Sequence, residues 1–149
     1  MQLRLVVQRA SRARGLPRTI SLREWARAAL VGSGPGTAEV TVRLVDEVES
    51  ADLNKRYRGK RGATNVLSFT YGMASAKPGL IGDLVICAPV VQHEAAQQDK
   101  RARAHWAHMV VHGILHLRGY DHVHQTDAEK MEAFEIRTLK RLGFPDPYA

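Results

Sequence analysis

The sequence predicts one domain, residues 1–149, with a four-stranded, mixed and mostly parallel sheet packed with about five helices. Three observations predict this fold. The predicted elements first alternate strand, helix, strand, helix, which favours parallel pairing, and then run through two strands and three helices. The chain has 149 residues, an ordinary size for one domain, and 44% of them are hydrophobic. No repeat, low-complexity tract or linker divides it.

The first three elements follow from alternating and helical patterns of apolar residues. Alternation predicts strands over residues 2–7 and 38–45. Between them, Ser21 and Glu24 fit a capping box, so we expect a helix to begin at Ser21. Its apolar face consists of Leu22, Trp25, Ala26, Ala29 and Leu30.

The middle of the chain predicts a short helix, a basic loop and a strand. Asp46 with Glu49 opens the helix, and the loop covers residues 57–62. The apolar residues of this helix are Val48, Ala51 and Leu53. Residues 66–69 predict a short strand, and residues 72–79, with two glycines and a proline, predict an exposed loop.

A buried strand and three helices complete the chain. Residues 81–87 are apolar enough for a strand buried on both faces. Pro89 suits the first turn of a helix, and a second helix is expected to run to Leu117. Thr126 with Glu129 fits a second capping box. The last helix is lined by Met131, Phe134, Thr138 and Leu142 and is closed by Gly143.

The composition favours a polyanionic partner. The formal net charge is +7, from 22 Lys and Arg against 15 Asp and Glu, and the pI is near 10.0. Such a surface attracts RNA or DNA, although a basic surface that merely keeps the protein soluble is the alternative. The basic residues form three groups, at residues 9–18, 55–61 and 100–103.

The same composition indicates a cytoplasmic protein. A single cysteine, Cys87, rules out an internal disulfide framework and fits a reducing compartment. The segment from Met1 to Arg9 has no uninterrupted apolar stretch of signal-peptide length. No run approaches the ~20 apolar residues of a membrane span, so we expect no membrane partner.

One stretch, His112 to His122, has the spacing of a metal site. His112 and His116 are four residues apart, which places both imidazoles on one face of a helix. Gly119 can end that helix with a positive φ and let the chain bring His122 toward the same point. Three imidazoles around one centre favour a catalytic zinc site with an open position for water. Surface or core histidines are the alternative.

This spacing matches the long zinc motif of metzincin proteases with one change. Those enzymes carry a glutamate, their general base, directly after the first histidine. Gly113 occupies that position here. The sequence therefore argues for a hydrolytic reaction other than proteolysis.

The residues resemble the YbeY family of bacterial rRNA maturation factors, which are zinc-dependent single-strand endoribonucleases. The resemblance rests on three stretches and runs from about Val40 to Gly143. They are His112-Gly-Ile-Leu-His-Leu-Arg-Gly-Tyr-Asp-His122, Leu53 to Phe69 with its Thr-Asn-Val-Leu-Ser-Phe block, and Gly82-Asp-Leu-Val-Ile-Cys87. The N-terminal third agrees only in length and general pattern.

The resemblance implies both a fold and a function. It implies an α+β domain whose metal-binding helix lines a cleft, with one Zn²⁺ per chain held by His112, His116 and His122. It also implies that Arg58 is a basic residue needed for function, and we expect catalysis to depend on Arg58 and His112. The implied role is cleavage of RNA in 16S rRNA 3′-end maturation and in ribosome quality control, with ribosome-associated proteins as further partners.

Several roles stay open at this point. Attack by water, with or without help from Asp121, and attack by the RNA 2′-hydroxyl are both compatible with the residues. Asp121 is better explained as a turn residue or a partner of a ligand imidazole. His108 falls near the ligand face, whereas His105 fits a packed or solvated helix surface. His124 fits a fourth ligand only weakly. Thr64, Asn65 and Asp83 fit either substrate contacts or local structure.

Three functions compete on these observations. A metal-dependent endoribonuclease leads, and a zinc-stabilised RNA-binding assembly factor without chemistry of its own is the second. A metalloprotease is the third, and both Gly113 and the basic charge argue against it.

Overall fold

The computed structural model confirms a single domain with a mixed four-stranded sheet, and it describes residues 1–71, 79–121 and 123–149. These residues form four strands and five helices, at nearly the positions expected. The strands are β1 (Gln2–Arg9), β2 (Thr37–Val45), β3 (Val66–Thr70) and β4 (Gly79–Cys87). The helices are α1 (Thr19–Ala29), α2 (Glu47–Arg58), α3 (Ala88–Gln97), α4 (Ala102–Leu117) and α5 (Gln125–Arg141). Residues 72–78 of the expected exposed loop lie outside the described part.

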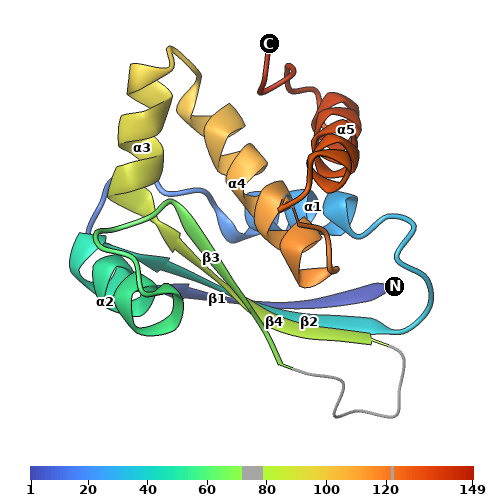
Figure 1. Ribbon diagram of the computed structural model, residues 1–149, viewed down its shortest axis with the longest axis horizontal. Helices are drawn as coiled ribbons and strands as arrows, with labels where there is room; N and C mark the ends of the chain where they lie inside the picture. The colour runs from blue at the N-terminus through green and yellow to red at the C-terminus, as the bar shows by residue number, and fades with distance from the viewer. Residues whose placement is uncertain (72–78, 122) are drawn as a thin grey trace.

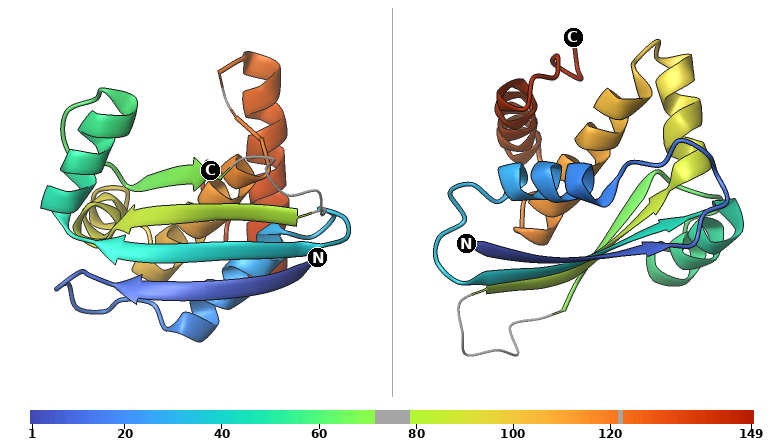
Figure 2. Two further views of the ribbon diagram at one scale, coloured as in Figure 1. Left: turned by 90° about the horizontal axis from the view of Figure 1, so that it is seen from below. Right: turned by 180° about the vertical axis from the view of Figure 1, so that it is seen from behind.

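The sheet has the strand order β1-β2-β4-β3. The pairs β1–β2 and β2–β4 are parallel, and β3 runs antiparallel to β4 as the edge strand, with Val66 opposite Ile86. Helices α1, α3, α4 and α5 lie on one side of the sheet (Figure 1, Figure 2). The strand β3 therefore forms the free edge beside α4, which carries the histidines.

The main core lies between the sheet and helices α1 and α4. Alternate residues of β2 and β4 face it, and they are buried because these helices cover that face. They include Val40, Val42, Leu44, Leu84 and Ile86. All five residues of the predicted apolar face on α1 are buried there, as expected. Val45, Leu67, Val85 and Cys87 form a smaller cluster on the opposite face, near α2.

Helix α4 lies unusually close to the sheet at two glycines. A Cβ atom on Gly113 would lie 2.7 Å from Leu84 Cδ2, and one on Gly82 would lie 2.6 Å from Leu117 Cδ2 and 2.9 Å from the Phe69 carbonyl oxygen. A side chain at Gly113 would require Leu84 to shift, and one at Gly82 would require Leu117 to shift and would in addition press on the main chain of Phe69. The glycines thus set the height of the histidine helix above β4.

Both predicted capping boxes are wrong. Helix α1 begins at Thr19 after Arg18, and the Ser21 hydroxyl accepts a hydrogen bond from Arg103 of α4 instead of capping α1. Helix α5 begins at Gln125, and Glu129 accepts a side-chain hydrogen bond from Gln125. In each case the helix begins before the predicted cap, and a residue of the predicted box bonds another side chain.

Helix α2 is longer than expected and buries a polar face. It continues through Tyr57 and Arg58, which had been expected in the loop, and ends at Gly59 with a φ of 65°. Val48, expected on its apolar face, is 86% exposed. Ser50 and Asn54 are buried instead, because their side chains bond the main chain of residues 62–64. The helix therefore fixes the basic loop that follows it.

The described residues contain no helix that is both long and apolar enough to cross a membrane.

Candidate metal centre

Four histidines form a stripe along α4. His105, His108, His112 and His116 follow one another at spacings of three, four and four residues, so they share one face of the helix. Neighbouring rings meet edge to face, with centroids 6.1, 6.1 and 4.6 Å apart along the stripe. His105 and His108 are buried, whereas His112 and His116 are partly exposed. The accessible end of the stripe is thus at His112 and His116.

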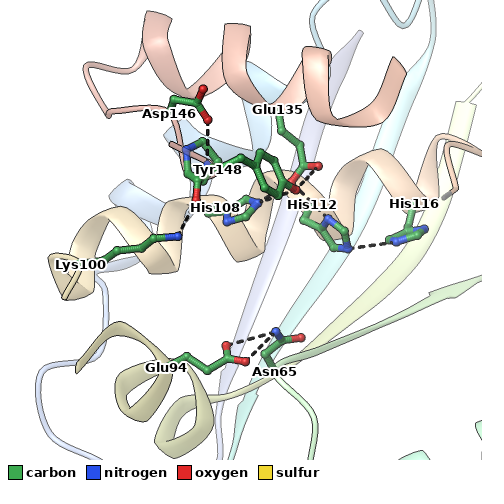
Figure 3. A network of polar contacts seen from close by, with 10 residues as sticks. Asn65, Glu94, Lys100, His108, His112, His116, Glu135, Asp146 and Tyr148 are labelled. Carbon is green, nitrogen blue, oxygen red and sulfur yellow. Dashed lines mark hydrogen bonds and ion pairs between the residues drawn. The ribbon is translucent and has the colours of Figure 1, made fainter. Parts of the chain in front are cut away.

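The geometry brings the two predicted ligands His112 and His116 together. Their Nε2 atoms are 3.1 Å apart (Figure 3). Two nitrogens bound to one tetrahedral metal at 2.0–2.1 Å would be about 3.3 Å apart. The donor atoms therefore fit a common ion. The third predicted ligand, His122, lies outside the described residues.

A cavity of about 790 Å³ adjoins His116. Its walls include Thr70 at the end of β3, Tyr71 directly after it, and Arg118 and Tyr120 after α4. Gly119, between these two, has a φ of 97°, which confirms that α4 ends there through a glycine. The volume lies within the range of roughly 300–1,000 Å³ that is typical of small-molecule sites.

Glu135 of α5 is the buried centre of the polar network around the histidines. It is 1% exposed, and its Oε2 atom lies 2.5 Å from His108 Nε2 and 3.2 Å from His112 Nδ1. Burial by itself would raise the pKa of Glu135, but the hydrogen bonds from His108 and His112 outweigh it and lower that pKa to about 2. Glu135 is therefore an ionised hydrogen-bond acceptor.

Tyr148 holds the other oxygen of the same carboxylate. Its hydroxyl donates a hydrogen bond of 2.9 Å to Glu135 Oε1. Burial and the charge of Glu135 both raise the pKa of Tyr148, so the hydroxyl keeps its proton. Neither Glu135 nor Tyr148 was predicted as a site residue. The sequence feature that could have identified Glu135 is its position as a charged residue on the buried side of a helix, the side that Met131 and Thr138 also occupy.

One further group of side chains could hold a metal ion. His108, His112 and Glu135 each offer a ligand atom, and these atoms all lie within 4.8 Å of one another. The group shares His112 with the pair described above. This helix therefore carries side chains that could hold a metal ion, with His112 common to both arrangements.

His105 lies on the packed part of the α4 surface and belongs to a second buried pair. Its Nε2 atom lies 2.9 Å from Oε1 of Glu94 on α3, and Asn65 donates hydrogen bonds to the same carboxylate. Burial lowers the pKa of His105 in spite of this carboxylate. The Asn65 side-chain oxygen accepts a hydrogen bond from the Val66 amide, so its contacts hold the start of β3.

The remaining residues with open roles make local contacts. Asp121 accepts a hydrogen bond from the Val123 amide, which is the turn role. Asp83 accepts a hydrogen bond from the Tyr71 hydroxyl, and the Thr64 main chain bonds Ser50. His124 is exposed at the residue before α5.

Arg58 is exposed at the last position of α2. The neighbouring Tyr57 ring contacts Phe69 of β3, with centroids 5.2 Å apart. This contact joins the basic end of α2 to the edge strand, whose next residues line the cavity beside His116. The contact is made by Tyr57, and Arg58 itself is not among the residues that line the cavity.

The structure also explains why a small residue follows His112. Gly113 faces β4 and β3, where Leu84 of β4 and Val66 of β3 lie closest to the position of a Cβ atom. Its carbonyl oxygen accepts a hydrogen bond from the Ser68 hydroxyl. A glutamate at this position, like the general base of a metzincin protease, would require Leu84 to shift from its place between the helix and the sheet.

Comparisons with known proteins agree on one family. The family described as endoribonuclease YbeY matches residues 18–143. Relatives named endoribonuclease YbeY include one from Methylococcus capsulatus, 54% identical over 97% of this chain and 94% of its own length. Another, from Nitrosococcus oceani, is 46% identical over 99% of this chain and 98% of its own length.

The comparison with solved structures agrees on the fold. The solution structure of the protein TM1509 from Thermotoga maritima matches with a TM-score of 0.56 and 23% identity. The match covers 93% of this chain and 92% of that one.

Proposed function

This chain belongs to the endoribonuclease YbeY family, and from that premise we propose that it cleaves single-stranded RNA with the help of a Zn²⁺ ion held by α4. The proposed biological role is 16S rRNA 3′-end maturation and ribosome quality control in the cytoplasm. The observation that supports the chemistry best is the pairing of His112 Nε2 with His116 Nε2 at 3.1 Å.

We assign the metal to His112, His116 and His122. The first two offer nitrogen atoms at a separation that suits a common ion, and the third follows α4 at the spacing of a catalytic zinc motif. When bound, Zn²⁺ activates water and stabilises the charge that develops on phosphoryl oxygens.

The protein's own residues bind and orient the RNA. The guanidinium of Arg58 can bond two oxygens of one phosphate at once, and the basic loop that follows adds Lys60 and Arg61, both exposed. The net charge of +7 attracts the polyanionic chain to this surface. The cavity beside His116 offers space for a nucleotide next to the cleaved phosphate.

A cleavage assay tests this function. An end-labelled precursor fragment of the 16S rRNA 3′ end would be incubated with the unsubstituted chain, His116→Ala and Arg58→Ala, each purified under conditions that remove host ribonucleases. Arg56→Ala is the matched control for Arg58→Ala, because Arg56 is a neighbouring exposed arginine on α2 paired with Asp52. We expect cleavage by the unsubstituted chain and Arg56→Ala only, and a chelator should abolish it.

The outcomes separate the competing functions. Equal cleavage by His116→Ala would show that a contaminant is responsible and would contradict the proposal. Salt-sensitive RNA binding without any product, even on an intact ribosomal precursor particle, would favour an assembly factor without chemistry. A 2′,3′-cyclic phosphate on the product would identify the RNA 2′-hydroxyl as the nucleophile, and a terminal phosphate without the ring would identify water.

A further inference from the structure

A chain of hydrogen bonds connects Tyr148 to the predicted metal ligand His112. The Tyr148 hydroxyl donates to Glu135 Oε1 at 2.9 Å, and Glu135 Oε2 lies 3.2 Å from His112 Nδ1 (Figure 3). Tyr148 follows α5 in sequence, and Glu135 lies within that helix. The segment after α5 thus reaches the metal-binding face of α4 through one buried carboxylate.

This chain fixes which nitrogen of His112 can bind a metal. A carboxylate without a proton accepts hydrogen bonds only, so Nδ1 of His112 must carry the proton in the bond to Glu135. A neutral imidazole then has its lone pair on Nε2, the atom that faces His116 Nε2 at 3.1 Å. The carboxylate therefore selects the tautomer that a metal at His112 and His116 requires.

Tyr148 is itself held by further contacts. Its amide donates to Asp146 Oδ1 at 2.8 Å, and the Lys100 ammonium donates to the Pro147 carbonyl oxygen at 2.6 Å. Its ring packs edge-on against His108, with centroids 5.4 Å apart. The Lys100 bond attaches residues 146–148 to the segment before α4, and the ring contact attaches them to His108, so the hydroxyl lies at Glu135 (Figure 3).

The distances argue that Glu135 is a hydrogen-bond partner and not a ligand. Its Oε2 atom lies 2.5 Å from His108 Nε2, whereas two ligand atoms of one tetrahedral ion would be about 3.3 Å apart. Its Oε1 atom is already bonded by Tyr148. Both oxygens are thus occupied by hydrogen bonds, which is how carboxylates support metal-bound histidines.

We propose that Tyr148 and Glu135 are positioning residues for the metal centre. The Tyr148 hydroxyl orients Glu135, and Glu135 fixes the tautomer and ring direction of His112. This inference rests on the proposed function in one respect, that an ion binds at His112 and His116.

The test is the affinity for Zn²⁺, measured by competition with a chromophoric chelator. Glu135→Gln should weaken binding by about 10- to 100-fold, as for other carboxylate partners of metal-bound histidines. Tyr148→Phe, which removes only the hydroxyl, should weaken it about fivefold because one hydrogen bond is lost. Tyr57→Phe is the matched control, since Tyr57 is exposed on α2, and it should bind as the unsubstituted chain does.

Urea unfolding in EDTA separates positioning from structural support. If Tyr148→Phe changes only stability and leaves the Zn²⁺ affinity unchanged, its role is structural and the proposal is wrong. If Glu135→Gln does not fold, Tyr148→Phe alone decides the question. Should His108→Gln lose Zn²⁺ as completely as His116→Ala does, the ion lies at His108 and the positioning role is refuted. Failure of the unsubstituted chain to bind Zn²⁺ would remove the proposed metal site itself, and this inference with it.

Discussion

Replacing Glu135 with alanine should destabilise the protein by about 3–5 kcal/mol even without metal. The carboxylate is 1% exposed and accepts hydrogen bonds from His108, His112 and Tyr148. Each buried donor left without a partner costs about 1–3 kcal/mol, so the three donors together would cost about 3–9 kcal/mol. The lower half of that range is expected, because water can reach His112, whose side chain is 19% exposed.

The assay is urea unfolding at pH 7 in EDTA, so that metal binding does not contribute to the difference. Glu132→Ala is the matched control, since Glu132 is an exposed glutamate on the same helix, and its effect should stay within about 0.5 kcal/mol. A loss of less than about 1 kcal/mol for Glu135→Ala would refute the reasoning, because the donors would then have found other partners at little cost.

Three further predictions concern the sheet and its connections. Leu84→Ala, fully buried against α4, should cost about 2–5 kcal/mol, whereas Ile81→Ala, 44% exposed on the opposite face, should cost far less in the same thermal unfolding experiment. Gly82→Ala should lower stability by about 1–3 kcal/mol, since its Cβ would lie 2.6 Å from Leu117 Cδ2, and an unchanged unfolding midpoint would contradict this close packing. Hydrogen bonds from Ser11 and Arg12 lower the pKa of Asp46 in the folded protein. The ionised carboxylate therefore stabilises the fold above about pH 4, and this stabilisation is lost as the pH falls through the folded-state pKa. The difference in the free energy of unfolding between the unsubstituted chain and Asp46→Asn should therefore shrink below about pH 4. A difference that widens below this pH would contradict a stabilising role of the ionised carboxylate.

Much of the fold could be predicted because its signals are local. The apolar face of α1 and the alternation of β2 depend only on periodicity, and both are buried as expected. Gly119 and Gly143 end their helices with φ values of 97° and 88°, which glycine alone adopts readily. The histidine pair of α4 follows from helical spacing in the same way.

What could not be predicted depends on contacts between distant segments. The Ser21 hydroxyl accepts a hydrogen bond from Arg103, 82 residues away, so a local capping rule failed there. Helix α2 buries Ser50 and Asn54 because they bind the main chain of the next loop, which no apolar pattern records. Glu135 is 23 residues from His112, and only the packing of α5 on α4 brings them together.

The position of a bound metal can be measured by anomalous diffraction at the zinc edge from crystals grown with Zn²⁺. We predict one peak about 2.0–2.1 Å from Nε2 of both His112 and His116, with Glu135 hydrogen-bonded to His112 Nδ1 and not bonded to the ion. A peak coordinated by Glu135 or His108, or no peak at α4, would contradict a metal centre at this pair of histidines.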